Sequence, residues 1–244
     1  MARFLLLCCL FAAVLTSSLT EAGDNNQVYS PCSDSTVAVG DGFTFGIAFA
    51  ARDSFFNSSH SVQFSPCDRR HLKLNGNSEI AVFRPKVDEI TLLTINTSSS
   101  SGFRPDASKG HMVAFAGAKY AARSIPIMVA DSDHVVTSFT LVLEFQKGRL
   151  ENLFWKKDGC SKCSGDTKFV CLNKEECAVK SQNCKNQGGQ GQVDCSLGIQ
   201  LAFSGTDKHY TALNSWYEVA NLKQYSLYGL YSNDSLTNPF KNIF

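Results

Sequence analysis

Large apolar residues and polar residues alternate most clearly between positions 138 and 157. Every second residue from Phe139 to Phe145 is a large apolar one, and this period of two places these side chains on one face of a β-strand. Gly148, which can take a positive φ, lies at the centre of a short turn. The residues from 150 to 157 alternate again, with apolar side chains on both faces. The pattern predicts a β-hairpin inside a two-layer structure.

Shorter strand signals, separated by polar turns, recur along the chain. Pro126 cannot donate a ladder hydrogen bond, so it limits its segment to a sheet edge or a strand end. Ile199, Leu201 and Phe203 share one face of the last strand. The spacing predicts an all-β fold, an antiparallel β-sandwich of the jelly-roll-like kind. The predicted strands cover residues 43–50, 78–83, 89–96, 112–116, 124–129 and 198–204.

Six cysteines lie between residues 160 and 195, after the predicted hairpin and before the last strand. This segment predicts a disulfide-rich loop insertion in the sandwich, not a separate module. Two further cysteines stand apart, and pairing with each other is their simplest arrangement. In an oxidising compartment the eight predict four disulfides, and the connectivity of the clustered six is left open. The eight are Cys32, Cys67, Cys160, Cys163, Cys171, Cys177, Cys184 and Cys195.

The Cys160-x-x-Cys163 spacing also occurs in zinc sites and in redox-active dithiols. No second pair with this spacing and no nearby histidine accompanies it in the segment, as a structural zinc site would require. A redox motif of the thioredoxin type would need a surrounding βαβ pattern, which the sequence does not show. We therefore expect structural disulfides, with no metal and no cofactor.

The first 22 residues predict a cleaved secretory signal peptide. Arg3 supplies a positive charge, residues 4–15 form an apolar stretch, and Thr20–Ala22 offers a cleavage site. The stretch is shorter than the ~20 residues that span a bilayer, and no later run is long enough. We expect residues 23–244 to form one secreted, extracellular domain. Sequons at Asn57, Asn96 and Asn233 predict glycosylated surface positions.

The charge balance narrows the classes of partner. The formal net charge is +1, whereas binding to nucleic-acid phosphates needs a basic face. We therefore expect no nucleic-acid partner. The 18 phenylalanines supply apolar volume, so the disulfides supplement a hydrophobic core and do not replace it.

No catalytic motif stands out in the sequence. The histidines are scattered, and no nucleophile elbow, zincin helix or phosphate-binding loop is present. The polar cluster at Asp131–His134 could hold a cation or an acid/base pair, but Asp and Ser favour turns, and a turn is our interpretation. Glu144 and Glu151 lie on the two hairpin strands, where cross-strand ion pairs explain them better than a hydrolytic carboxylate pair. We assign no catalytic residue.

Aromatic residues are frequent in the last third of the chain. Exposed Trp and Tyr side chains on a β-sandwich can stack on sugar rings, much as they anchor other interfaces. The candidate ligand-binding residues are Trp155, Trp216 and Tyr217. The alternative is that these side chains fill the core, as large aromatic residues commonly do.

Three stretches carry a resemblance to a known family: FRPKVDEI from Phe83, SFTLVLEFQKGRLENLFWKKDGC from Ser138 and QYSLYGLYSNDSL from Gln224. Through them, most of the chain after residue 22 resembles a plant family of secreted proteins, the Expp-type expressed proteins. The resemblance implies a plant origin and an apoplastic location. It implies no activity and no catalytic residue.

Three functions are open at this point. We favour a secreted, disulfide-stabilised, non-enzymatic extracellular protein, with cell-wall carbohydrate as its candidate ligand. The first alternative is a secreted hydrolase whose site is assembled in space from residues such as Asp131, Asp133, His134 and Glu144. The second is a protein-interaction module that uses the cysteine-rich insertion to contact an extracellular protein.

Overall fold

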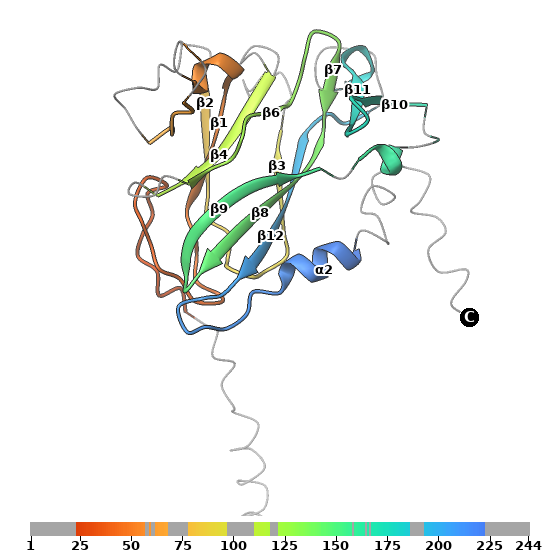
Figure 1. The fold of residues 1–244 in the computed structure, drawn as a ribbon. Coiled ribbons are helices and arrows are strands. Elements are labelled where there is room, and N and C mark those ends of the chain that lie inside the picture. Colours follow the sequence, from red (N-terminus) through yellow and green to blue (C-terminus); the bar gives the residue numbers. More distant parts are fainter. Residues whose placement is uncertain are drawn as a thin grey trace, which may run out of the picture.

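The computed structural model shows an all-β protein in which two sheets pack face to face and a third, smaller sheet lies beside them (Figure 1). The predicted fold class is therefore confirmed. Residues 1–22, Asn57 and Asn233, which carry the predicted signal peptide and two sequons, lie outside the described residues. The structure describes residues 23–56, 59, 62–67, 78–96, 110–117, 122–157, 159–163, 165, 167–185 and 193–222.

The first sheet has the strand order β2-β1-β4-β5, and β6 also pairs with β4. Backbone outside the ladder separates β5 from β6 at residues 124–126, which confirms that Pro126 interrupts its segment. A 3₁₀ turn, η1 (Arg52–Phe55), follows the first strand. The strands are β1 (Phe45–Ala51), β2 (Glu79–Phe83), β4 (Gly110–Ala116), β5 (Ala122–Arg123) and β6 (Ile127–Met128).

The second sheet has the order β3-β12-β8-β9. The predicted hairpin is confirmed as β8 and β9, with Leu141 opposite Trp155 and a bulge between Glu144 and Phe145. Gly148 has φ +74° in the hairpin turn, as predicted. Helix α2 (Ser215–Leu222) packs on the outer face of this sheet, where Trp216 contacts Val142 and Ala202. The strands are β3 (Thr91–Ile95), β8 (Ser138–Gln146), β9 (Arg149–Lys156) and β12 (Leu197–Gly205).

One pair of strands departs from the antiparallel prediction. β12 runs parallel to β8, with Leu201 opposite Leu141 and Phe203 opposite Leu143, while the other ladders between the described strands are antiparallel. Parallel neighbours cannot be joined by a tight turn, because the chain must first return to the end where it started. Here β9 provides that return, and the cysteine-rich insertion then carries the chain from β9 to β12 on the other side of β8.

The hydrophobic core lies between the two large sheets. Side chains at alternate positions of facing strands meet there and are almost fully buried. The rings of Phe43 and Phe145 contact each other edge to face, with centroids 5.0 Å apart, an arrangement that aromatic rings favour. Fully buried members from both sheets include Phe45, Ile47, Met112, Leu141, Leu143, Leu201 and Phe203.

The cysteine-rich insertion has strands of its own and is more than a loop. η2 (Cys160–Cys163) precedes a hairpin of β10 (Phe169–Leu172) and β11 (Glu176–Lys180), and η3 (Ser181–Asn183) follows. β11 also pairs with β7 (His134–Val136), so the third sheet has the order β10-β11-β7. Because β7 leads directly into β8, the insertion is docked on the chain that enters the main hairpin.

Four disulfides form among the eight predicted cysteines. The pairing of Cys32 with Cys67 is confirmed, and the connectivity that the sequence left open is now defined. Multiple disulfides are typical of proteins in oxidising compartments, and the structure is compatible with an extracellular protein. The bridges are Cys32–Cys67, Cys160–Cys171, Cys163–Cys177 and Cys184–Cys195.

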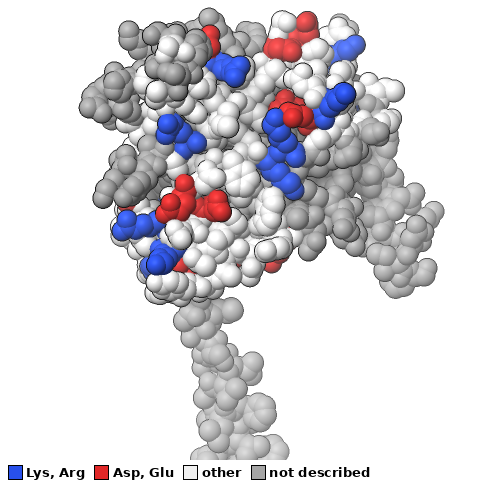
Figure 2. Space-filling model, viewed as in Figure 1, with Lys and Arg blue, Asp and Glu red and all other residues white. Residues whose placement is uncertain are grey.

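Within the described part of the chain, no helix has the length and apolar character that a membrane crossing requires. The face of the molecule seen in Figure 2 carries basic and acidic side chains interspersed, without a large area of one sign. Asn96, the one sequon asparagine among the described residues, is exposed directly after β3. Its glycosylation stays a prediction.

Glu176 lies at the seam between the insertion and the main hairpin. It lines a small cavity of about 40 Å³ together with Thr140 and Trp155. Burial raises the pKa of its carboxyl group, and the negative charge of Glu175 acts in the same direction, while Lys157 opposes both. The ionised form of Glu176 is therefore disfavoured in the folded protein.

We predict that Glu176→Gln stabilises the protein at neutral pH, by on the order of 0.5 kcal/mol because the group is only half-buried. A carboxyl whose pKa is raised on folding destabilises the fold above that pKa, and the penalty disappears as the pH falls through it. The gain should thus be largest near pH 7 and vanish towards pH 4. Urea unfolding at several pH values measures it. Glu79→Gln, on an exposed position of β2, is the matched control, and an equal gain there would contradict the prediction.

Candidate functional site

A cavity of about 480 Å³, open to solvent and lined by polar and apolar residues, lies where the N-terminal segment crosses the ends of both large sheets. We call residues 24–36 the strap, and this cavity the strap cavity. The end of β4, the start of β9 and Phe43 complete its wall, and in Figure 1 the strap is the red-orange chain beside the β8–β9 turn. The lining residues are Asn26, Val28, Ser33, Asp34, Ser35, Thr36, Phe43, Ala116, Gly117, Arg149 and Leu150.

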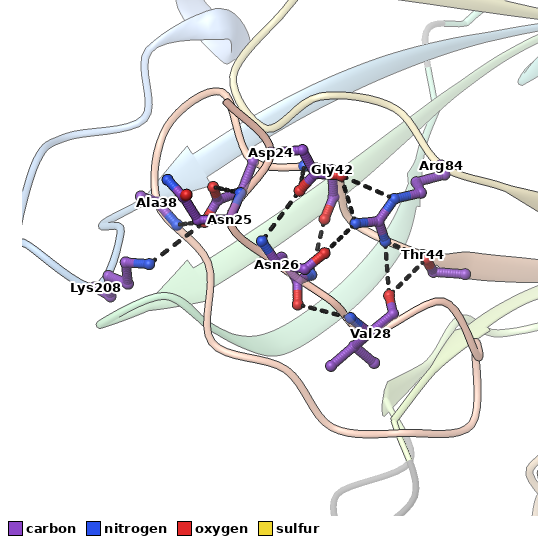
Figure 3. Close-up of polar contacts among 10 residues, drawn as sticks. Asp24, Asn25, Asn26, Val28, Ala38, Gly42, Thr44, Arg84 and Lys208 are labelled. Atoms are coloured by element: carbon purple, nitrogen blue, oxygen red, sulfur yellow. Dashed lines mark hydrogen bonds and ion pairs between the residues drawn. The ribbon is translucent and has the colours of Figure 1, made fainter. Parts of the chain in front are cut away.

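Arg84, which follows β2, fastens the strap to the sandwich (Figure 3). Its guanidinium donates to Asp24 Oδ2 from Nε at 3.2 Å and from Nη2 at 2.6 Å. It also donates to the carbonyl of Val28 at 2.6 Å and to Thr44 Oγ1 at 2.7 Å, and it contacts the carbonyl of Asn26. The planar fork of Arg suits such multiple contacts. One side chain therefore holds the strap at three points.

The guanidinium of Arg84 also stacks on the ring of Tyr29, with 4.3 Å between the Cζ atom and the ring centroid. Such a cation–π contact adds about 0.5–1 kcal/mol at exposed sites. Tyr29 itself is 61% exposed, so the contact covers the guanidinium on the solvent side. The strap is thereby held by stacking as well as by hydrogen bonds.

Asn26 forms part of the cavity wall and is only 6% exposed. Its Nδ2 donates to the carbonyl of Gly42 at 2.8 Å, and its Oδ1 accepts from the backbone N–H of Val28 at 3.2 Å. A buried polar group must be paired, and both ends of this amide are paired with backbone. Asn26 is thus a structural element of the wall.

Asp24 closes the same network. Partial burial opposes ionisation, but hydrogen bonds from Arg84 and from the backbone N–H groups of Gly42 and Asn26 outweigh it and lower the pKa of the carboxyl. The Gly42 N–H lies 2.9 Å from Asp24 Oδ1. The ion pair with Arg84 is partly shielded from solvent. Asp24 is therefore ionised throughout the neutral range.

The neighbouring loop is tied down by two buried aspartates. Asp41 accepts from the backbone N–H groups of Ala38 and Asn25, at 2.8 and 3.1 Å, and lies 3.5 Å from Lys208 Nζ. For Asp207, burial opposes ionisation, yet three backbone N–H donors outweigh it and lower the pKa of the carboxyl. The backbone of residues 38 and 39, which follows the strap, is thus hydrogen-bonded to Asp41 on one side and to Asp207 on the other.

The groups that could meet a ligand are the side chains of Ser33, Asp34, Ser35, Thr36 and Arg149. All five are exposed or half-buried. The guanidinium of Arg149 has no hydrogen-bond or ion-pair partner among the described residues. Among the described residues, the lining of the cavity therefore includes three hydroxyl groups, the guanidinium of Arg149 and the carboxylate of Asp34, which already has an interaction within the protein.

Gly117 lets the strap approach β4 closely. It has φ +77°, and a Cβ placed on it would lie 2.6 Å from Asp34 Oδ1. Its N–H donates to the carbonyl of Pro31 at 2.8 Å. Only a residue without a side chain tolerates both the backbone conformation and this distance.

The sequence analysis did not identify the polar lining of the strap cavity as a site, because a run such as Ser33–Thr36 looks like an ordinary loop.

The predicted ligand-binding aromatic residues do not form one surface. Trp155 points to the inner side of the second sheet, where its ring meets Phe139 with centroids 5.9 Å apart. Trp216 lies on the outer side, beneath Lys156 Nζ at 4.7 Å from the ring centroid. Tyr217, beside it on α2, is 66% exposed. Trp216 and Tyr217 are therefore neighbours, and Trp155 is separated from them by the sheet.

The residues named for a hydrolase are not brought together either. Asp131 and His134 share one tight turn, in which Asp131 Oδ1 accepts from the N–H groups of Asp133 and His134 at 2.8 and 2.7 Å. These bonds outweigh partial burial and lower the pKa of Asp131. The predicted turn is confirmed. Glu144 is exposed and lies six residues along β8 from its start, about 20 Å at the rise of a strand.

The described residues contain one group with metal-ligand geometry, formed by Cys160, Cys163 and Cys177. Their sulfur atoms lie within 4.8 Å of one another. All three are engaged in disulfides, and a thiolate, not a disulfide sulfur, is the usual ligand for zinc. In the disulfide form this group is therefore not a metal site.

We predict that Asp24→Asn and Arg84→Gln each lower the free energy of unfolding by about 1–2 kcal/mol, through lost charge-assisted hydrogen bonds. Because the pKa of Asp24 is lowered on folding, its contribution is present at neutral pH and disappears as the pH falls through that lowered pKa. The difference between Asp24→Asn and the unmodified protein should thus vanish in strong acid.

Urea unfolding and amide exchange at Asn26 and Gly42 measure this effect. The control is Lys86→Gln, which removes an ion pair with Glu89 whose side chains are more than half exposed and should change stability by less than about 0.5 kcal/mol. Equal losses for Lys86→Gln and Arg84→Gln would contradict the anchoring role of Arg84.

Comparison with known proteins places the chain in a family. A family model described as "Uncharacterised protein DDB_G0273449" matches residues 1–135 and 127–236. No curated protein and no solved structure matches the chain. The expected resemblance to the plant Expp-type family was wrong, because the family model that matches is a different one. The three stretches that suggested the plant family lie within the residues that this other model matches. The chain belongs to the family of uncharacterised protein DDB_G0273449.

Proposed function

We propose that this chain acts outside the cell as a non-enzymatic binding protein that holds a unit of cell-wall carbohydrate in the strap cavity. The observation that carries the proposal is the cavity itself, a space of about 480 Å³ whose wall is anchored by Arg84 and lined by both polar and apolar residues. Ligand sites typically measure about 300–1,000 Å³, so one or two sugar rings are of suitable size.

The mixture of groups in the cavity favours a neutral, hydroxyl-rich ligand. Asp34 can only accept hydrogen bonds and Arg149 can only donate them, while the hydroxyl groups of Ser33, Ser35 and Thr36 do both. A strongly anionic ligand would meet the Asp34 carboxylate, and a cationic one would meet Arg149. A sugar presents donors and acceptors side by side and can satisfy both.

The wall is also preorganised for binding. Asn26 and Val28 are held by the Arg84 network before any ligand arrives, so little ordering is needed on association, and this lowers the cost of binding. Leu150, which is half-buried, supplies apolar contact for the carbon face of a ring. Most ligand sites combine these two features, apolar surface and a few fixed polar groups.

Binding fits the cavity better than hydrolysis. Glycoside hydrolysis normally needs two carboxyl groups about 5–9 Å apart, and among the described residues that line the strap cavity only Asp34 bears a carboxyl group. The four disulfides support an extracellular location, where carbohydrate is an abundant partner. Secretion through the predicted signal peptide is part of the proposal.

The test is a glycan array with neutral oligosaccharides, followed by calorimetric titration of the best binder. We expect Asp34→Asn and Arg149→Gln each to raise the Kd at least about tenfold, because a hydrogen bond to a charged group contributes about 1.5–3 kcal/mol. Glu144→Gln, which changes an exposed carboxylate on β8, should leave the Kd unchanged. Thermal unfolding of each variant shows whether it is folded.

A fourth variant, Tyr217→Ala, separates the strap cavity from the aromatic surface of α2. If Tyr217→Ala abolishes binding while the two cavity variants bind normally, the ligand site lies on α2 and the cavity assignment is wrong. If the folded protein binds neither the array nor wall polysaccharides, the carbohydrate proposal is rejected.

A further inference from the structure

Two of the disulfides in the insertion lie unusually close to each other. Cys160 and Cys163 are the two ends of η2, while Cys171 and Cys177 face each other across the β10–β11 hairpin. The bridges Cys160–Cys171 and Cys163–Cys177 tie the two ends of η2 to the two strands. The sulfur of Cys160 therefore lies within 4.8 Å of both sulfurs of the other bridge.

The same backbone allows a second pairing of these four cysteines. In a 3₁₀ turn, residues i and i+3 project from the same side and are about 6 Å apart along the axis, within the ~4.4–6.8 Å usual between the Cα atoms of a disulfide. Directly opposite residues of an antiparallel pair are about 4.5–5.5 Å apart. Bridges Cys160–Cys163 and Cys171–Cys177 thus fit the geometry as well as the observed pair, whose Cα distances are 5.6 and 5.9 Å.

The geometry points to a thiol-catalysed disulfide isomerisation site at these four cysteines. The observed bridges, Cys160–Cys171 and Cys163–Cys177, tie η2 to the β10–β11 hairpin. The alternative bridges, which we call local, would join Cys160 to Cys163 within η2 and Cys171 to Cys177 within the hairpin, and would leave η2 without a covalent link to the hairpin. An external low-molecular-weight thiol of the glutathione class starts the exchange and is regenerated at its end, so no net oxidation or reduction occurs. The inference is independent of the carbohydrate proposal, because the four cysteines do not line the strap cavity.

The exchange runs through three balanced displacements of one thiolate by another. The external thiolate attacks Sγ of Cys171, forms a mixed disulfide there and releases the thiolate of Cys160. That thiolate attacks Sγ of Cys163, forms the Cys160–Cys163 bridge and releases the thiolate of Cys177. Finally, Cys177 attacks Sγ of Cys171 in the mixed disulfide, forms the Cys171–Cys177 bridge and expels the external thiolate.

Accessibility favours this starting point over the other bridges. Cys171 is exposed and Cys160 is half-buried, so a thiol from solution can reach the first bridge. Cys184 and Cys195 are both fully buried, and buried disulfides are shielded from attack. Cys32 and Cys67 are part-buried, and no third cysteine, histidine or carboxylate of the described residues joins them in a compact group. Reduction of Cys32–Cys67 therefore has no internal route to a new pairing.

The experiment treats the folded protein with a small amount of reduced glutathione and a little oxidised glutathione, followed by acid quenching, alkylation and non-reducing tryptic mapping. Trypsin cuts after Lys162, Lys168 and Lys174, which separate the four cysteines from one another in sequence, so each pairing gives distinct linked peptides. We expect peptides with Cys160–Cys163 and Cys171–Cys177 to appear at least about tenfold faster than any loss of Cys184–Cys195.

A double variant, Cys163→Ser with Cys177→Ser, is the matched control. It keeps the first bridge and removes its partner, so glutathione should reduce Cys160–Cys171 to free thiols without forming a new pair. The inference is overturned if the unmodified protein behaves in the same way, or if the local bridges appear only after all four disulfides are reduced. It is also overturned if the partly reduced protein forms no local bridge but binds one equivalent of added Zn²⁺, since the group would then be a metal site.

Discussion

The parallel pairing of β8 with β12 is the constraint on which the rest of the architecture depends. These two strands lie at the centre of the second sheet, flanked by β3 and β9. They are covered on both faces, by the core on the inner face and by α2 on the outer face. Parallel neighbours require a long return connection, so the chain must come back to the end where β8 starts before β12 can begin. β9 makes that return as an antiparallel strand, ending with Lys156 opposite Thr140, and the cysteine-rich insertion then carries the chain past β8 to β12. Three disulfides stabilise this connection between β9 and β12, which runs outside the sheet.

The sequence was sufficient to locate the strands in which apolar and polar residues alternate clearly. It was not sufficient to predict how these strands pair with one another. The β8–β9 hairpin could be located because Phe139 to Phe145 encode one face directly and Gly148 marks the turn. The parallel register could not, since it joins Leu141 to Leu201 across a long stretch of sequence that has no pattern of its own. β10 and β11 were missed for a related reason. They have four and five residues, contain cysteines and are stabilised by pairing with β7 and by bridges, which are tertiary features.

The candidate binding residues also could be predicted from the sequence only in part. Aromatic residues attract attention in a sequence, yet Trp155 and Trp216 lie on opposite sides of the second sheet, because Trp155 faces inwards from β9 and Trp216 belongs to α2 on the outer face. Trp155 packs inwards, while the adjacent Lys156 points outwards and covers Trp216. The strap cavity, by contrast, is assembled from the strap, the end of β4 and the start of β9. Its polar residues resemble an ordinary loop, and the importance of Arg84 becomes visible only when its contacts with Asp24, Val28 and Thr44 are known.

The two candidate sites lie at opposite ends of one strand. Arg149 and Leu150, at the start of β9, line the strap cavity, and Trp155 and Lys156, at its end, face the seam with the insertion. β9 is an edge strand of its sheet, but it is paired with β8 along nearly its whole length, apart from the bulge between Glu144 and Phe145. A rearrangement of the Cys160–Cys177 bridges would move η2 relative to its hairpin without changing the register of β9. The fold thus separates the strap cavity from the four clustered cysteines, with the length of β9 between them.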